Sequence, residues 1–335
     1  MAVRTSGLYS PATVVVAEED SLVCAQEGLS KEASSATLGS SSIGVVHFCA
    51  RSTVLDLHRE LQGLESLAPC EATDSFFCRL VDFVISPIHG DISPQDLFRA
   101  LESDERIAAI KHHFVRACSL GEGELESHWA RRIIDGKTSI DQFPYYQNYI
   151  DLTRLEYHLL VGQGADPRHI LFLGSGALPL SGLMWVKNHL CPRWTMASDW
   201  SVTNVDVLPS ASFSAAAVSR IALQDTDPSL QRFHFVTTDA HHLDAGLVYS
   251  HDVIYLAALV GCDMKTKASV LRSVIAKMKP GARLMIRSAD GMRQLLYPAV
   301  DEAALLCAAE GKLVLEATCH PRNHVVNSVV VARRV

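Results

Sequence analysis

Residues 169–180 have the sequence His169-Ile-Leu-Phe-Leu-Gly-Ser-Gly-Ala-Leu-Pro-Leu180. The apolar residues 170–173 predict a short buried strand, and Gly174-Ser175-Gly176 ends it with a turn. Glycines at such a turn let the backbone bend tightly and approach a ligand closely. The full G-x-G-x-x-G is absent because Pro179 stands where its third glycine would be, and the chain has no G-x-x-x-x-G-K. The stretch predicts a Rossmann-like strand and turn, but by itself it is weak evidence for a nucleotide site.

Further apolar runs, separated mainly by helical stretches, predict the rest of a sheet. Strands that alternate with helices indicate a parallel sheet, and two β-rich runs near the C-terminus predict a final hairpin. We therefore predict an α/β fold with a Rossmann-like sheet of the class I methyltransferase type. The strands predicted after the first are Asn204–Val207, Phe233–Thr237, Val253–Leu259, Arg283–Arg287, Leu313–Cys319 and Val325–Val331.

The chain before this sheet has a different pattern. Leucines at positions 55, 57, 61, 64 and 67 recur near a helical period, and no strand alternation follows up to about Leu160. We predict an all-helical accessory domain over residues 51–160 and a Rossmann-like domain over residues 161–335. Residues 1–50, which are rich in alanine and serine, are predicted to be a poorly ordered leader.

Composition excludes several classes of protein. The 335-residue chain has a net charge of -7, whereas nucleic-acid binders usually present a basic surface. No apolar run reaches the roughly 18–20 residues that a membrane span needs, and the short run Val14–Ala17 is followed at once by acidic residues. The nine cysteines form no C-x-x-C pair, so we expect reduced thiols and no metal site. These features predict a cytoplasmic protein without nucleic-acid or membrane partners; they leave the oligomeric state open, with a homodimer as one option.

Acidic residues stand at the ends of the second and third predicted strands. Asp206 is suitably placed to accept hydrogen bonds from ribose hydroxyls, and Asp239 could hold an adenine amino group. Each acid could instead cap the helix that follows it. Together with Gly174, Ser175 and Gly176 they predict a dinucleotide or S-adenosylmethionine site at the carboxyl edge of the sheet. The missing third glycine and the β-rich tail favour S-adenosylmethionine over NAD.

Six longer motifs carry a resemblance to one family, the nicotianamine synthases, over about residues 76–335. In chain order they are Glu122-Gly-Glu-Leu-Glu-Ser-His128, Phe143-Pro-Tyr-Tyr-Gln-Asn-Tyr149 continuing to Leu155-Glu156, Gly174-Ser-Gly-Ala-Leu-Pro-Leu180, Asp252-Val-Ile-Tyr-Leu-Ala-Ala-Leu-Val-Gly261, Leu296-Tyr-Pro-Ala-Val-Asp301, and His320-Pro321 followed by Val325-Val-Asn-Ser-Val-Val330.

The resemblance implies a helical domain packed on a Rossmann-like domain, and a reaction other than methylation. An amine nitrogen attacks the Cγ carbon of S-adenosylmethionine, takes its 3-amino-3-carboxypropyl group and expels methylthioadenosine. Nicotianamine synthases repeat this transfer, and one unit closes to an azetidine ring. S-adenosylmethionine is then a substrate, and no metal is implied for the enzyme itself.

The reacting amine arrives as an ammonium, so it needs a general base with a pKa near neutrality. A carboxylate in a partly dry cavity suits this role. Glu126 matches the glutamate position that looks catalytic in the family, and Glu124 is the fallback. A solvated helix carboxylate is the structural alternative for either residue. The motif that ends at Gly261 adds Ala257 and Ala258 to the predicted cofactor site.

Three tyrosines form a second predicted group. Tyr145 and Tyr149 share a helix face, and Tyr146 pairs with Tyr149 three residues on. Phenol rings can stabilise a sulfonium by cation–π attraction, so we assign Tyr149 and Tyr146 to catalysis and Tyr145 to substrate binding; the alternative is that all three join the two domains. Arg287 could hold a substrate carboxylate through two hydrogen bonds, or it could belong to a buried structural ion pair.

Some positions depart from the family pattern. A histidine often stands where this chain has Asp290, an asparagine where it has Ser212, and a polar residue where it has Leu208. These departures leave the cofactor prediction intact but put the product in doubt. The leading hypothesis is transfer to an amine. The alternatives are closure of S-adenosylmethionine on its own amine to give azetidine-2-carboxylate, ordinary methyl transfer, and a non-catalytic adenosine-binding protein.

Overall fold

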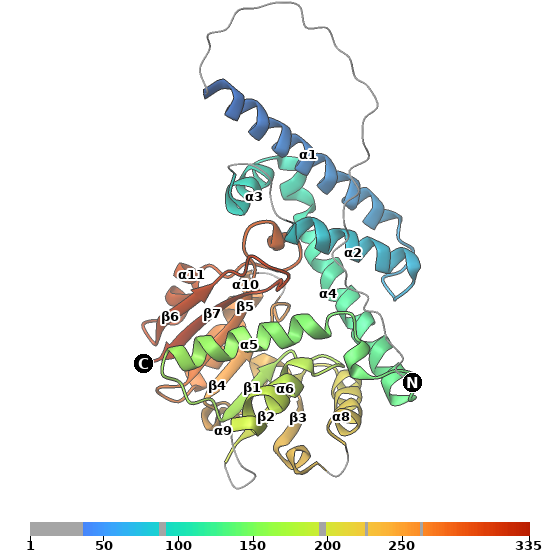
Figure 1. Ribbon diagram of the computed structural model, residues 1–335. Helices are drawn as coiled ribbons and strands as arrows, with labels where there is room; N and C mark the ends of the chain where they lie inside the picture. Colours follow the sequence, from blue (N-terminus) through green and yellow to red (C-terminus); the bar gives the residue numbers. More distant parts are fainter. Residues whose placement is uncertain (1–35, 87–91, 194–198, 225–226, 262–263) are drawn as a thin grey trace, which may run out of the picture. The chain divides into compact units, whose positions relative to one another are not determined.

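The computed structural model describes residues 36–86, 92–193, 199–224, 227–261 and 264–335 (Figure 1). Residues 41–335 form one compact unit, and apart from the beginning of helix α1 all that follows concerns this unit. Most of the leader predicted over residues 1–50 lies outside the described residues. Its final part is helical, because α1 spans Ala36–Gly63. The limits of the predicted helical and Rossmann-like domains stay predictions.

Seven strands form one sheet in the order β3-β2-β1-β4-β5-β7-β6. The strands β1 to β5 are parallel, and β7 runs antiparallel between β5 and β6. The predicted class I methyltransferase-type sheet with a terminal hairpin is therefore confirmed. The strands are β1 His169–Leu173, β2 Ser201–Asp206, β3 Phe233–Thr237, β4 Val253–Leu256, β5 Arg283–Ser288, β6 Leu313–Cys319 and β7 Ser328–Arg334.

Two predicted strands have other limits in the structure: β4 is shorter than predicted, and β7 begins and ends three residues later than predicted. β4 ends at Leu256 rather than at Leu259, because a turn follows in which the Val260 N–H donates to the Ala257 carbonyl at 3.1 Å. β7 begins at Ser328 rather than at Val325, because side-chain amides bind the preceding backbone: Val325 donates to Asn323 and Val326 to Asn148. Apolar residues lie just after the end of β4 and just before the beginning of β7, so hydrophobicity alone placed these two strand limits wrongly.

Helices cover both faces of the sheet (Figure 1). Because successive side chains of a strand point to opposite faces, Ile170 and Phe172 of β1 enter one core, with α5, α6 and α8, while Leu171 and Leu173 enter the other, with α9, α10 and α11. These helices are α5 Tyr146–Gly162, α6 Leu180–Trp185, α8 Pro209–Leu223, α9 Ala245–Ser250, α10 Met264–Lys277 and α11 Glu302–Ala308, and a short α7, Cys191–Arg193, follows α6.

The remaining helices build a third core with loops of the sheet region. Leu80, Leu97 and Phe114 pack there with Met292 and Leu296, which follow β5. Both α3 and α4 are preceded by a capping residue whose side chain accepts a backbone N–H of the first turn, Ser93 and Asp104 respectively. The helices are α2 Glu71–Ile85, α3 Pro94–Glu102 and α4 Glu105–Ile134.

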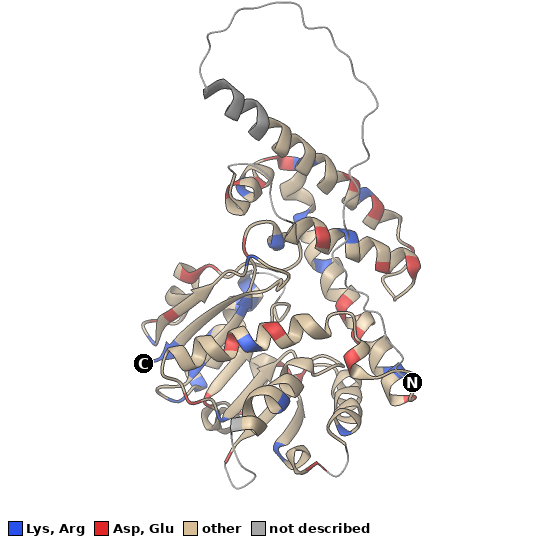
Figure 2. Cartoon of the chain, viewed as in Figure 1, with Lys and Arg blue, Asp and Glu red and all other residues tan. Residues whose placement is uncertain are grey.

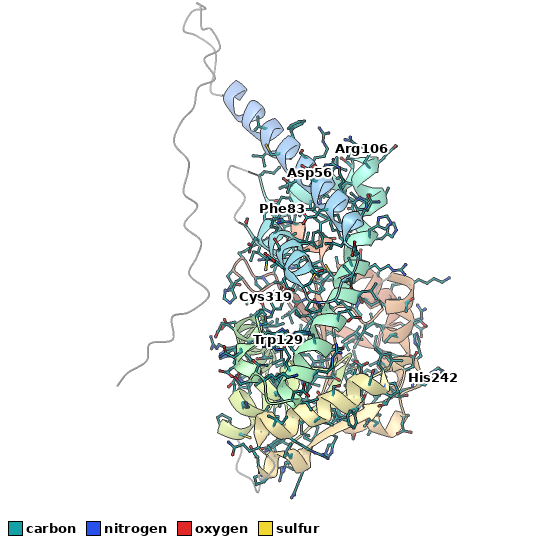
Figure 3. The ribbon with its side chains drawn as sticks, turned by 90° about the vertical axis from the view of Figure 1, so that its right-hand side faces the viewer. Asp56, Phe83, Arg106, Trp129, His242 and Cys319 are labelled. Atoms are coloured by element: carbon teal, nitrogen blue, oxygen red, sulfur yellow. The ribbon has the colours of Figure 1, made fainter. Side chains whose placement is uncertain are left out.

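Helix α4 links the helical layer to the sheet. Phe114 in its first half belongs to the helical core, whereas Ala130 and Ile133 near its end belong to a core of the sheet. Trp129, labelled on α4 in Figure 3, packs edge-on against Phe143 with ring centroids 5.7 Å apart. The middle of α4 therefore lies where the two layers meet.

Charged residues of both signs are interspersed along α1, α2 and α4 (Figure 2). Within the described ranges, no helix is long and apolar enough to cross a membrane.

Candidate active site

A cavity of about 620 Å³ lies at the carboxyl ends of the central parallel strands. Residues after β1, β2, β3 and β4 line it on the sheet side, and most of the residues from Ser119 to Ser127 of α4 line it on the helical side. Open α/β sheets bind ligands at this edge, where neighbouring strands lead their loops apart. The cavity is within the usual size range of small-molecule sites.

The glycine turn after β1 and Glu126 of α4 are in direct contact. The Ala177 N–H donates to Oε2 of Glu126 at 3.0 Å, and the Leu178 N–H reaches the same oxygen at 3.5 Å. Gly176 has φ +67°, and a Cβ atom there would lie 1.9 Å from Oε2 of Glu126. The turn therefore needs glycine at this position both for its backbone conformation and for the close approach of the carboxylate.

The same turn is tied to the end of β2. The backbone N–H groups of Gly174 and Ser175 donate to the Val205 carbonyl, and the Gly176 N–H donates to Oδ2 of Asp206 at 2.9 Å. The other carboxylate oxygen of Asp206 accepts the Leu208 N–H at 2.9 Å. Asp206 lines the cavity, and each oxygen has a further lone pair for a ligand.

Two carboxyl groups of α4 lie in a poorly hydrated environment. Loss of water around Glu126 raises the pKa of its carboxyl to about 8, and repulsion from Glu122 adds to the effect. Loss of water also raises the pKa of Glu122 to about 7, although the hydrogen bond from Tyr297 opposes the rise. Protein surrounds both side chains except where they face the cavity. Glu126 can therefore exchange a proton near neutral pH.

Arg287 of β5 is engaged by the protein itself. Its Nε and Nη2 donate to the two carboxylate oxygens of Glu156 on α5 at 2.7 and 3.1 Å. Glu156 is fully buried and Arg287 nearly so. Arg287 also lines the cavity, and its guanidinium lies 5.9 Å from the ring centroid of Tyr149. The structure thus contains the buried ion pair, and a substrate carboxylate would have to share this arginine with Glu156.

The structure separates the three predicted tyrosines. Tyr149 lines the cavity, and loss of water around its phenol raises its pKa. Tyr145 and Tyr146, at the beginning of α5, are not among the cavity residues and pack against a core of the sheet, where Tyr145 lies 5.9 Å from Phe143 between ring centroids. The roles in catalysis and substrate binding predicted for Tyr146 and Tyr145 therefore stay predictions without a place in the cavity.

Of the residues predicted to bind the adenine side of the cofactor, some line the cavity and one does not. Ala257 and Ala258 line the cavity in the turn after β4. Asp239 does not: its carboxylate accepts the backbone N–H of His241 at 2.8 Å and lies 2.9 Å from the ring Nδ1 of the same residue. It thus caps the short helix that begins at Ala240, the alternative expected for such an acid, while its neighbours Thr238 and Ala240 line the cavity.

Other cavity residues were not predicted from the sequence. Glu122 and Tyr297 are hydrogen-bonded partners, and the buried amide nitrogen of Asn327 has no hydrogen-bond partner within the described residues. All three stand in motifs quoted above. The spacing of Glu122 and Glu126, four residues apart on one helix face, was the available signal. The described residues include no group of three or more histidines, cysteines or acids that could hold a metal ion.

This sheet, with ionisable side chains gathered at the carboxyl ends of its strands, defines an enzyme of the class I methyltransferase fold. The family model described as nicotianamine synthase protein matches residues 49–335. The chain belongs to the nicotianamine synthase family.

Individual relatives agree with this assignment. The chain is 36% identical over 288 residues to probable nicotianamine synthase 4 of Arabidopsis thaliana, covering 84% of this chain and 82% of that relative. It is also 36% identical over 288 residues to nicotianamine synthase 1 of Oryza sativa subsp. japonica, covering 84% and 80%. A solved structure of MtNAS in complex with MTA and tNA has a TM-score of 0.66 at 16% identity and covers 85% of this chain and 97% of that one; this likeness is one of fold.

Proposed function

We propose that this enzyme transfers the 3-amino-3-carboxypropyl group of S-adenosylmethionine to an amine and releases methylthioadenosine. The contact between Glu126 and the glycine turn is the observation that carries the proposal, because it brings a carboxyl with a pKa of about 8 to the predicted nucleoside site. Family membership supports it as well, and a mutant of the structural relative MtNAS was crystallised with S-adenosylmethionine.

The reaction needs one proton transfer and one substitution. Glu126 takes a proton from the ammonium of the acceptor, and the freed nitrogen lone pair attacks the Cγ carbon of S-adenosylmethionine. The bond between that carbon and sulfur breaks, and its electron pair remains on sulfur, so the leaving group is the neutral thioether methylthioadenosine. A sulfonium activates all three carbons bonded to it, and so the enzyme selects Cγ by holding the nitrogen in line with it.

The remaining cavity residues suit the parts of the substrate. In this proposal Asp206 accepts hydrogen bonds from the ribose hydroxyls, and Gly174–Gly176 with Ala257 and Ala258 lie along the nucleoside. Tyr149 faces the sulfonium, which its ring attracts by cation–π interaction. Arg287 is then shared between Glu156 and an α-carboxylate of the substrate.

Membership of the nicotianamine synthase family favours this transfer over both azetidine-2-carboxylate formation and methyl transfer. A cytoplasmic location, a homodimer and the absence of nucleic-acid and membrane partners stay predictions from the sequence.

Product analysis tests the proposal. The purified protein is incubated with S-adenosylmethionine alone, and the products are identified by mass spectrometry. We expect methylthioadenosine together with joined aminocarboxypropyl units. Methylthioadenosine with only azetidine-2-carboxylate would contradict transfer to a second amine, and S-adenosylhomocysteine formed with an added acceptor would indicate methyl transfer.

The base is tested by Glu126→Gln, which keeps the shape of the side chain but cannot take the proton. We expect S-adenosylmethionine to bind nearly as well, while the rate of methylthioadenosine release falls roughly 10²-fold or more. Glu124→Gln is the comparison, since Glu124 is the exposed acid two residues away on the same helix. A larger loss in that variant would assign the base to Glu124.

A further inference from the structure

Glu122 and Tyr297 bring two distant parts of the chain together inside the cavity. The Tyr297 hydroxyl donates to Oε1 of Glu122, and both residues line the cavity. Tyr297 lies in the segment between β5 and α11, whereas Glu122 lies on α4, one helical turn before Glu126. Residues four apart on a helix are neighbours on its surface, so the hydrogen bond fixes a second carboxyl group beside Glu126.

The charges around this pair of acids are unbalanced. Within the described ranges neither Glu122 nor Glu126 forms an ion pair. Arg287 is the cation that acts on Glu122, and Glu156 already holds it through both oxygens. The other ionisable groups that face the two acids are Asp206 from β2, Tyr149 from α5, Cys118 from α4 and Tyr297 itself.

We propose that Glu122, held by Tyr297, is a positioning residue whose negative charge makes Glu126 a stronger base for the proton of the acceptor amine. This inference rests on the proposed function. A like charge nearby disfavours ionisation of a carboxyl, and repulsion from Glu122 is the second largest cause of the raised pKa of Glu126. The two acids therefore titrate as a coupled pair. When Glu122 is ionised, Glu126 binds a proton more tightly than it would alone.

A purely structural role makes a different prediction. If Glu122 and Tyr297 only tie α4 to the segment before α11, their loss would lower the rate equally at every pH. If Glu122 acts through its charge, its loss would change the pH at which Glu126 gains its proton. The pH dependence of kcat/KM reports the ionisation of the free enzyme and separates the two roles.

The experiment uses Glu122→Gln in the full chain. Glutamine still accepts the Tyr297 hydrogen bond through its side-chain oxygen, but it carries no charge. kcat/KM for methylthioadenosine release from S-adenosylmethionine is measured from pH 5.5 to 9.5. We expect the acidic limb of the profile to move to lower pH by about one unit, with a lower plateau because the base is weaker. Glu105→Gln is the control: it makes the same charge change at the exposed beginning of α4.

An acidic limb at the wild-type pH in a folded E122Q enzyme would overturn the inference. Tyr297→Phe gives a second test, since it leaves Glu122 in place but removes the hydrogen bond that favours its ionised form. The limb should move in the same direction by a smaller amount, and this variant decides the matter if circular dichroism shows that E122Q does not fold. A wild-type enzyme that releases no methylthioadenosine would instead refute the proposed function.

Discussion

Gly176→Ala tests whether the contact between the turn and α4 controls the chemistry. The added methyl group would lie 1.9 Å from Oε2 of Glu126. To restore even 3.4 Å, somewhat less than the optimal carbon contact, the carboxylate must move about 1.5 Å, which breaks its 3.0 Å hydrogen bond from Ala177. Displacements of about 1 Å can cost 10²-fold in rate. We expect kcat to fall roughly 10²-fold, while binding of S-adenosylmethionine changes much less.

Backbone strain must be separated from this displacement. Alanine at φ +67° costs about 1–2 kcal/mol in any setting. Gly164 has φ +71° with no atom within 4 Å of an added Cβ, so Gly164→Ala carries the strain without the clash. Denaturant unfolding should show a loss of about that size for both variants, whereas stopped assays of methylthioadenosine release should show the rate defect in G176A alone. Equal turnover in G176A and G164A would refute the link between the turn and Glu126.

Two further predictions concern stability. In the folded chain Glu126 keeps its proton up to about pH 8, compared with about 4.5 for a free carboxyl, so the stability of the wild-type protein should fall as pH rises across that window. Because glutamine cannot ionise, the melting temperature of E126Q relative to that of wild type should be higher at pH 8 than at pH 5. A difference in melting temperature that is independent of pH would contradict the raised pKa. Arg287→Met leaves Glu156 buried without its partner and should cost about 3–5 kcal/mol in urea unfolding, with part of the loss recovered in R287M/E156Q; full stability of R287M alone would show that the pair is dispensable.

Much of the fold was predictable because it depends on local patterns. Short apolar runs separated by helical stretches determine a parallel sheet, and Gly174-Ser175-Gly176 marks its ligand-binding edge. Asp206 was predictable for the same reason, since the end of a parallel strand is defined by its neighbours in sequence. The structure brings it into the cavity with Glu126 and Tyr149.

Partners that are distant in sequence could not be predicted. Nothing near Arg287 indicates that Glu156, 131 residues earlier, occupies its guanidinium, or that Tyr297 reaches Glu122 across 175 residues. For Asp239 the local sequence itself was ambiguous, because it suits both a ligand contact and a helix cap. In the structure its carboxylate accepts the backbone N–H of His241.

The hydrogen bond from Ala177 to Glu126 joins residues 51 positions apart. On the proposed function, the acid and the electrophile meet only after helix and sheet have docked. A nascent or partly opened polypeptide would lack the proton acceptor even if it could capture S-adenosylmethionine. Completion of the tertiary structure would thus act as a safeguard, so that the cell's supply of this reactive sulfonium is not broken down by immature copies of the enzyme.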